Sequence, residues 1–300
     1  MSDPSYIHLR LHTEYSISDG ILRIKDLCKA AAEDEMPAIA ITDLSNLFGM
    51  VKFFKEARKY GIKPIIGCDV WVTNPKDRQS PFRGLLLVQN RAGYLKLCDW
   101  LSQAYLTNQF QGRPEIKKDW FLETGTDGVI ALSGAEGGEV GVAMAKRNMV
   151  ASEEIAKGWK DLFGNRFYLE VQRGDGGRSE QIVQATVKLG SKLNIPVLAT
   201  HPVQFLRRDD FNAHEARVCI SEGHLLGDSR RPKIFDNTQY LMSQSEMVSL
   251  YQDFPELLEN TVQVAKRCSF SFELGVPKLP IFPTPDGEDL SKYLGKTAEV

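Results

Sequence analysis

The sequence predicts an α/β fold in which a parallel sheet closes into a seven-stranded (β/α) barrel. Three observations point to it. Apolar runs of strand length alternate with helix-length amphipathic segments through the first two hundred residues, the connections between them are short and polar, and seven such units are present. This alternation is typical of parallel sheets with right-handed crossovers. Seven units favour a closed or nearly closed barrel, and an open sheet is the alternative that the pattern leaves open.

The predicted strands are short apolar runs at 6–11, 37–42, 64–72, 84–89, 128–132, 166–172 and 196–200. Between them the apolar residues recur with helical spacing, which predicts helices over 24–35, 49–60, 91–108, 137–147, 150–163 and 180–194, and a further helix over 209–222. The chain is then loop-rich from Gly223 to Asn237. Helical patterns resume over 243–253 and 255–268.

Four prolines between positions 277 and 285 mark the end of the first domain. Each proline fixes φ and disfavours helix in the residue before it, so this segment is expected to be extended. We therefore predict one domain over 1–272 and a proline-rich exit over 273–300. A new helix begins near Glu288 and no stop signal follows it, so we expect the sequence to be part of a longer protein.

Composition excludes several classes of function. The formal net charge of −2 does not support binding to nucleic acid through overall charge. No apolar run approaches the roughly 18 residues that a membrane span needs, and the N-terminus lacks the order of a signal peptide. The five cysteines are odd in number and form no CxxC motif. We expect reduced thiols in a cytoplasmic protein.

The first predicted strand carries the outline of a metal site. His8, Arg10 and His12 share one face of it, and Asp19 follows in a turn. Imidazoles two residues apart at a strand end, with an acid close by, are typical of metallohydrolases. Arg10 breaks this pattern, because a guanidinium has no lone pair to give a metal.

The other strand ends supply fewer ligands than an active site would need. In a parallel barrel the chemistry lies at the C-terminal ends of the strands, where Asp43, Asp69, Glu170 and His201 are expected. Arg83 stands before the fourth predicted strand. A polynuclear site would want about nine ligands rich in histidine and carboxylate. The arginines would instead neutralise the acids without a metal ion.

Structural interpretations compete with the functional ones. Asp43 or Asn46 could cap the helix that follows the second strand, and Asp69 is expected to pair with Arg10 or to lie at an edge. For the other histidines a structural role is favoured, hydrogen-bonded for His8 and at the surface or an interface for His214 and His224. The basic groups Arg207–Arg208 and Arg230–Arg231 with Lys233 could contact DNA, but solvated loops are the favoured interpretation.

Longer motifs carry a resemblance to a known family. They are HLRLHTEYSISDG at 8–20, AIAITDLSNLFGMVKFFKEARKYGIKPIIGCDV at 38–70, NRAGYLKL at 90–97, VIALSGAEGGEVG at 129–141 and LPIFPTPDG at 279–287. From residue 5 to the end, the sequence resembles the N-terminal polymerase-and-histidinol-phosphatase (PHP) domain of bacterial replicative DNA polymerase III alpha subunits. The resemblance implies a distorted seven-stranded (β/α)7 barrel. In active members nine ligands hold a metal cluster that hydrolyses phosphoester bonds.

Most of that ligand pattern is changed here. His12 and Asp19 are kept, and Asp69 replaces the usual glutamate with a shorter acid. The remaining family positions fall on Arg10, Leu44, Arg83, Ala135, Pro202 and Gln204, while His201 lies where the family usually has another residue. Because each lost ligand weakens metal binding, we predict a vestigial site without metal at Arg10, His12, Asp19, Asp43, Leu44, Asp69, Arg83, Ala135, His201 and Gln204.

The resemblance also implies a role. The chain would be part of a Mg-dependent DNA polymerase whose catalytic residues lie beyond residue 300, with 273–300 leading into the polymerase palm. No catalytic residue and no cofactor are then expected in this part. We expect a scaffold that supports the polymerase core and binds the epsilon proofreading exonuclease subunit, with other replicase subunits and DNA met through the rest of the chain. The alternative is a residual metal-dependent phosphoesterase or 3′–5′ exonuclease using His12, Asp19, Asp43, Asp69 and His201.

Overall fold

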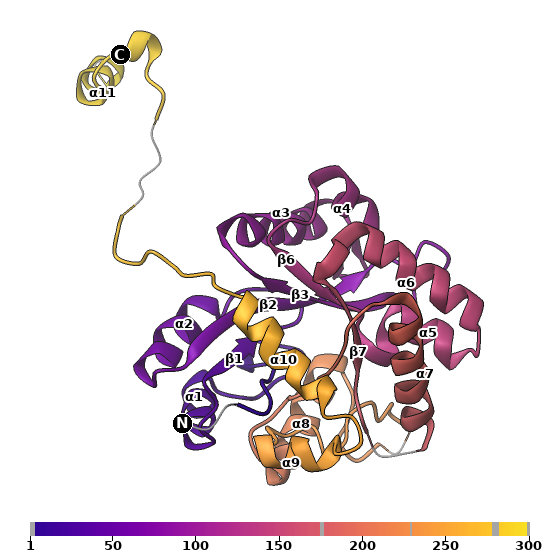
Figure 1. The fold of residues 1–300 in the computed structure, drawn as a ribbon. Coiled ribbons are helices and arrows are strands. Elements are labelled where there is room, and N and C mark those ends of the chain that lie inside the picture. The colour runs from indigo at the N-terminus through magenta and orange to yellow at the C-terminus, as the bar shows by residue number, and fades with distance from the viewer. Residues whose placement is uncertain (1–3, 175–176, 229, 278–281, 299–300) are drawn as a thin grey trace. The chain divides into compact units, whose positions relative to one another are not determined.

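The computed structural model describes residues 4–174, 177–228, 230–277 and 282–298, and the chain divides into two compact units (Figure 1). Unit 1 is Met1–Phe270 and unit 2 is Ser271–Val300. Unit 2 contains a 3₁₀ turn at Pro285–Gly287 and helix α11 at Leu290–Ala298. The predicted proline-rich extended segment includes residues 278–281, which lie outside the described residues. The functional boundary at 272 stays a prediction.

Unit 1 is built on a curved sheet of eight strands. These are β1 (Ala38–Ile41), β2 (Lys63–Val72), β3 (Phe82–Val88), β4 (Gln109–Phe110), β5 (Arg113–Ile116), β6 (Val129–Leu132), β7 (Phe167–Val171) and β8 (Val197–Ala199). The order is β4-β5-β2-β3-β6-β7-β8, and β1 pairs with β2. The strands predicted over 37–42, 64–72, 84–89, 128–132, 166–172 and 196–200 are confirmed, and the short hairpin β4–β5 was not predicted.

The expectation of an all-parallel sheet is wrong at β3. This strand runs antiparallel to both β2 and β6, whereas β1–β2, β2–β5, β6–β7 and β7–β8 are parallel. The reason lies in the connection 73–81 between β2 and β3. A crossover to a parallel strand takes about a dozen residues or more and usually a helix, and this loop has neither.

The predicted first strand, 6–11, is extended but joins its neighbours through single hydrogen bonds and not a regular ladder. On one side the backbone N–H groups of Ala40 and Thr42 donate to the carbonyls of His8 (2.9 Å) and Leu11 (3.0 Å). On the other side the His12 N–H donates to the Val203 carbonyl at 2.9 Å. The N-terminal segment therefore lies between β1 and the segment that follows β8, as a distorted barrel requires.

Helices surround the sheet (Figure 1). They are α1 (Ile24–Glu33), α2 (Met50–Lys59), α3 (Arg91–Thr107), α4 (Lys118–Thr124), α5 (Glu139–Ala145), α6 (Met149–Phe163), α7 (Gly177–Leu193), α8 (Phe211–Glu222), α9 (Gln244–Leu250) and α10 (Glu256–Arg267). Each predicted helix is present. Their buried residues follow helical spacing, as in α1, where Ile24, Leu27, Cys28 and Ala31 face the sheet. Helix α4 was not predicted, because seven residues give too short a pattern.

Helix α10 covers the N-terminal ends of the strands. The side chains of Asn260 and Lys63 bond the carbonyls of Val197 (2.7 Å) and Ala265 (2.8 Å), joining α10 to the starts of β8 and β2. The Ile7 N–H donates to Thr261 Oγ1 at 3.0 Å at the start of the N-terminal segment. With that end covered, the C-terminal strand ends are left for a site. Every helix among the described residues is too short or too polar to span a membrane.

Candidate functional site

A cavity of about 220 Å³ opens at the C-terminal ends of the strands. We call it the strand-end cavity. Six residues of the predicted vestigial site line it: Arg10, His12, Asp19, Asp69, Arg83 and Gln204. Gly134, Gln172 and Pro202 complete part of the wall, and Ile234 and Phe235 reach it from the long loop after α8. The structure thus gathers side chains that lie far apart in the sequence.

Asp69 of β2 is the centre of the cluster. Its carboxylate accepts hydrogen bonds from Arg10 Nη1, from Arg83 Nε (3.1 Å) and Nη2, and from His12 Nε2 (3.0 Å). The residue is 1% exposed. Burial alone would raise the pKa of Asp69, but Arg10, Arg83 and His12 outweigh burial and hold it well below its usual value. The predicted pairing of Arg10 with Asp69 is confirmed.

Glu170 of β7 holds the other side of the Arg10 guanidinium. Arg10 donates from Nε to Oε1 (2.7 Å) and from Nη2 to Oε2 (3.0 Å), a bidentate geometry that fixes its plane. Glu170 also accepts from the Gly134 N–H (3.0 Å) and Thr200 Oγ1 (2.5 Å). Glu170 is one of the expected strand-end acids but is not among the predicted site residues. Glu170 and Gln172 lie two residues apart at the end of one predicted strand, and this alternation of polar side chains was the signal that could have placed Glu170 in the site.

His12 is the third cation of the cluster. Its Nδ1 lies 3.0 and 3.1 Å from the two oxygens of Asp19. Burial alone would lower the pKa of His12, but Asp19 and Asp69 outweigh burial and raise the pKa to about 9. The ring is therefore protonated at neutral pH and donates from both nitrogens. In turn, burial would raise the pKa of Asp19, but His12 lowers it below its usual value.

Gln204 contacts the same ring, with its Nε2 3.3 Å from His12 Nδ1. Its Oε1 is buried without a hydrogen-bond partner. A protonated imidazole cannot accept a hydrogen bond, so this contact suits an amide whose oxygen, not its nitrogen, faces the ring.

Asp43 has a structural role outside the strand-end cavity. Its carboxylate accepts from the Thr13 N–H (2.6 Å), the Thr13 hydroxyl and the Ser16 hydroxyl (3.0 Å). Burial raises the pKa of Asp43, and the Thr13 hydrogen bonds compensate only in part. The helix-capping interpretation is wrong for Asp43 and Asn46, because the residue before α2 is Gly49, with no side-chain cap. Asp43 instead fixes the turn between His12 and Asp19.

Three other predicted positions do not line the cavity. Leu44 donates its backbone N–H to Ser16 Oγ (3.0 Å), and Ala135 is buried in a left-handed turn. His201 Nε2 bonds the Thr238 carbonyl at 2.9 Å, and burial lowers its pKa to about 4. His201 is thus neutral, and its Nε2 is already hydrogen-bonded to the backbone. Of the five residues in the alternative ligand set, His12, Asp19 and Asp69 meet, while Asp43 and His201 face elsewhere.

Two further histidines, His8 and His214, differ in how they compare with their predicted roles. His8 bonds the Met242 carbonyl at 2.7 Å, which confirms its predicted structural role. Burial lowers the pKa of His8 to about 3, so it is neutral. His214 is fully buried, which rules out the surface alternative and leaves a packing role between elements. It packs against Phe205 and Phe235 because α8 turns this side inward.

The basic groups considered for DNA are mostly engaged within the protein. Arg231 pairs with Glu215, and both side chains are under a tenth exposed. Arg230 pairs with Asp228 at 3.1 Å, while the Arg208 guanidinium lies 5.4 Å from the centroid of the Tyr240 ring. The solvated-loop interpretation fits Arg230, but Arg231 is an internal anchor for the loop.

Comparison with known proteins identifies the family. The family model described as "PHP domain" matches residues 8–174, more than half of the chain. The chain belongs to the PHP domain family.

Relatives of this PHP domain share its sequence over almost all its length. It is 47% identical to DNA polymerase III subunit alpha of Neisseria meningitidis serogroup A, covering 99% of this chain and 26% of that protein. The same subunit of Pseudomonas aeruginosa is 44% identical over 97% of this chain and 25% of the relative. That of Escherichia coli K12 is 39% identical, covering 100% and 26%. The chain spans about a quarter of the length of these relatives.

The charged groups of this PHP domain's strand-end cavity are engaged with one another. Within the described ranges, no group of three or more His, Cys, Asp or Glu side chains is placed to hold a metal ion. The carboxylates of Asp69 and Glu170 are directed at guanidinium groups, and Asp19 is directed at the protonated His12. A divalent ion at Asp69 would have to approach Arg10 and Arg83. Fixed positive charge there opposes metal binding.

Gly134 offers a local test of this arrangement. Its φ is +82°, and a Cβ would lie 2.2 Å from the Arg83 carbonyl oxygen. Its N–H also holds Glu170. Gly134→Ala should therefore lower the free energy of unfolding by about 2 kcal/mol or more in urea titrations. Gly158→Ala on α6, where a Cβ meets open space, is the matched control. It should raise stability by about 0.5–1 kcal/mol, and equal effects of the two changes would contradict the close approach at Gly134.

Proposed function

We propose that this PHP domain is a non-catalytic scaffold within a replicative DNA polymerase of the cytoplasm. One observation supports it most strongly. Asp69, the acid at the centre of the strand-end cavity, is shared by Arg10, Arg83 and His12. Three cations and the three acids Asp19, Asp69 and Glu170 balance one another in that cluster.

Such a cluster favours stability over catalysis. Metal-assisted phosphoester hydrolysis needs a cation that activates water and binds the transferring group while exchanging its own ligands. A guanidinium held bidentately by Glu170 and also by Asp69 has no exchangeable position. It neutralises the buried acids and cross-links the N-terminal segment to β2 and β7. Residual phosphoesterase or exonuclease activity would require His12, Asp19 and Asp69 to leave these partners.

The wider role follows from the relatives. They are DNA polymerase III alpha subunits, and the similarity covers essentially the whole of this chain. We therefore propose that the parent protein synthesises DNA with Mg²⁺ at a palm domain outside this sequence. This domain would support that core and bind the epsilon proofreading exonuclease subunit, while DNA and other replicase subunits are met elsewhere on the parent chain.

Binding to the exonuclease subunit tests the scaffold role. The purified 300-residue chain should form a stoichiometric complex with the epsilon subunit of the same organism in titration calorimetry. The Arg230→Glu variant is a control for non-specific charge attraction, because that side chain is highly exposed. If epsilon binds the complete alpha subunit but not this chain, the proposed docking role is wrong. Primer extension by the chain alone should be absent.

A further inference from the structure

A groove follows helix α7 on a part of unit 1 that contributes nothing to the strand-end cavity. Two cavities of about 560 and 320 Å³ adjoin there and share Met149, Gln181 and Ala185. Figure 1 shows α7 beside α5 and α6, the elements that form the other wall. We call this feature the α7 groove.

The floor of the α7 groove is apolar. It is formed by Met144, Met149, Ile182, Ala185 and Leu189. Met149 is 45% exposed, and its neighbour Val150 is 70% exposed. Exposed apolar surface beside a concave site is typical of protein interaction sites, and methionine adapts to the shape of a partner.

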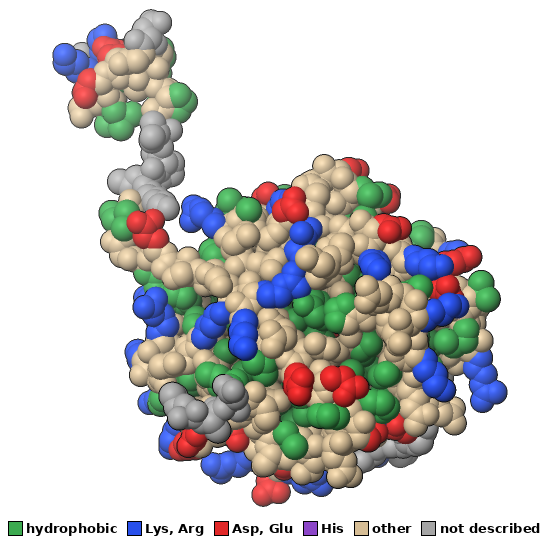
Figure 2. All heavy atoms as spheres, viewed as in Figure 1, with side chains coloured by type: hydrophobic (Ala, Val, Ile, Leu, Met, Phe, Trp, Pro, Cys, Tyr) green, Lys and Arg blue, Asp and Glu red, His purple; other side chains and the backbone are tan. Residues whose placement is uncertain are grey.

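The rim of the groove is basic. Arg147, Lys188 and Lys192 line it together with a single acid, Glu153. Glu153 is itself held by Lys192 (2.5 Å) and Lys157 (2.9 Å), so it leaves a local excess of positive charge. Lys and Arg side chains are prominent on the side of unit 1 where α5, α6 and α7 lie (Figure 2, right). The chain as a whole carries a net charge of −2, so this excess is a local feature.

The groove is preformed by bonds within its walls. The Arg147 N–H donates to the Met144 carbonyl at 2.8 Å, and the Asn148 side chain caps α6 by accepting from the Ala151 N–H at 3.1 Å. The Thr186 hydroxyl on α7 contacts Met144 Sδ at 3.2 Å. The turn that carries Arg147 is therefore already ordered before a partner binds, and this lowers the entropic cost of binding.

We propose that the α7 groove binds an acidic amphipathic helix of a partner protein. The lining residues of α7 run from 181 to 192, about 17 Å at the rise of a helix, which matches some three turns of a docked helix. Apolar residues of the partner would fill the floor, and its carboxylates would face Arg147, Lys188 and Lys192. The partner is defined by its apolar residues and its carboxylates. The inference therefore does not depend on the proposed role of this domain as a metal-free scaffold.

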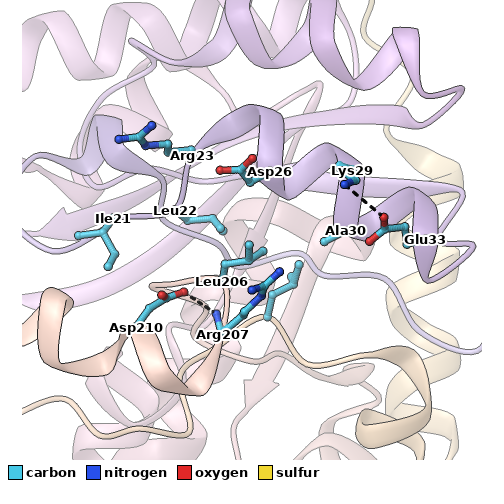
Figure 3. Close-up of a pocket in the computed structure, with 11 residues that line it drawn as sticks. Ile21, Leu22, Arg23, Asp26, Lys29, Ala30, Glu33, Leu206, Arg207 and Asp210 are labelled. Carbon is cyan, nitrogen blue, oxygen red and sulfur yellow. Dashed lines mark hydrogen bonds and ion pairs between the residues drawn. The ribbon is translucent and has the colours of Figure 1, made fainter.

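Other occupants fit less well. The floor has no aromatic side chain on which a nucleic-acid base could stack. A second copy of this chain would bring the same basic rim against its own. The hollow beside α1, about 540 Å³, differs in that its rim is mixed (Figure 3). Its charged residues are Arg23, Lys29, Arg207, Asp26, Glu33 and Asp210. Such a balanced rim favours neither an acidic nor a basic ligand, whereas the basic rim of the α7 groove favours an acidic one.

Peptide binding tests the proposal. The probe is a fluorescein-labelled synthetic helix of about 14 residues, with leucine at i, i+3, i+4 and i+7 and glutamate on the flanks. Its fluorescence anisotropy with the whole chain should show saturable binding that weakens with salt. Arg147→Glu/Lys188→Glu should weaken that binding about tenfold or more, and should allow binding of the same peptide with lysine in place of glutamate. Ala185→Trp should block both peptides by filling the space that the two cavities share.

The control is Lys25→Glu/Lys55→Glu, the same change of charge at exposed positions outside the groove. It should leave the affinity within about twofold of the wild-type value, with thermal unfolding of every variant checked in parallel. The proposal is overturned by the absence of saturable binding or by equal loss of affinity in the control. It is also overturned if a 12-mer oligothymidine binds the groove more tightly than the acidic peptide and Arg147→Glu/Lys188→Glu abolishes that binding.

Discussion

Arg10→Ala should lower the free energy of unfolding by about 3–5 kcal/mol, the range expected when one member of a buried ion pair is removed. If Arg10 neutralises Asp19 and Asp69, as the sequence suggests, the expected loss is about 2–4 kcal/mol. In the structure Asp19 pairs with His12 instead, and Glu170 is the second partner of Arg10. The substitution would therefore leave two acids, Asp69 and Glu170, each no more than 2% exposed, without their main cation. Urea unfolding followed by circular dichroism at pH 7 measures the loss.

Two further variants separate charge from packing. Arg10→Met/Glu170→Gln removes the charges while keeping most of the volume, and should lose clearly less than Arg10→Met and Glu170→Gln added together. Arg230→Ala removes an arginine whose side chain is 88% exposed, and should change stability by less than about 0.5 kcal/mol. An Arg10→Ala loss as small as that of Arg230→Ala would contradict the charge-balanced cluster.

His12 should make the stability depend on pH over the range 6.5 to 9. Its pKa rises from 6.5 to about 9 on folding, because Asp19 and Asp69 outweigh burial. A raised folded-state pKa gives stability that is complete below pH 6.5 and is lost as the pH rises through 9. The full contribution is about 3 kcal/mol for a shift of this size. Urea titrations at half-unit steps from pH 6 to 9.5 measure it.

The comparison with His12→Gln isolates this contribution. Buried thiols also titrate at high pH, since burial raises the pKa of Cys268 to about 12, so the difference between wild type and variant is the useful quantity. That difference should shrink as the pH rises from 6.5 to 9. His224→Gln, in the exposed loop after α8, should keep the wild-type pH profile. A constant difference between wild type and His12→Gln would mean that His12 is not charged in the folded protein.

Much of the fold was predictable because its helices are amphipathic and its strands are short buried runs. Helices such as α2, with Met50, Phe53, Phe54 and Ala57 buried on one side, follow directly from the spacing of apolar residues. The reversal of β3 was missed because strand composition carries no direction, although the short loop 73–81 before it already excluded a crossover. The hairpin β4–β5 was missed because two strands of two and four residues show no period.

Part of the site was predictable because its residues could be located relative to the predicted strands. Arg10, His12, Asp19 and Asp69 were found because they lie toward strand ends or follow them closely, and a barrel brings those ends together. Arg83 stands before the fourth predicted strand, and it joins them because β3 runs antiparallel to β2 and starts beside the end of that strand. The sequence predicts the pair of Arg10 with Asp69, but not the other partners within the cluster. Asp43 turned toward Thr13 and Ser16, His201 turned to the backbone at Thr238, and Glu170 became the second partner of Arg10. Those choices depend on side-chain direction at each strand end, which tertiary packing decides.

Titration calorimetry of the whole chain with Mn²⁺ and with Zn²⁺ tests the central claim most directly. If Arg10, Arg83 and His12 occupy the place of a metal cluster, neither ion should show stoichiometric binding, and Asp19→Asn should leave the thermogram unchanged. Hydrolysis of bis(p-nitrophenyl) phosphate in the same solutions should equal the buffer rate. Binding of two or three ions per chain, lost in Asp19→Asn together with hydrolysis, would contradict the account.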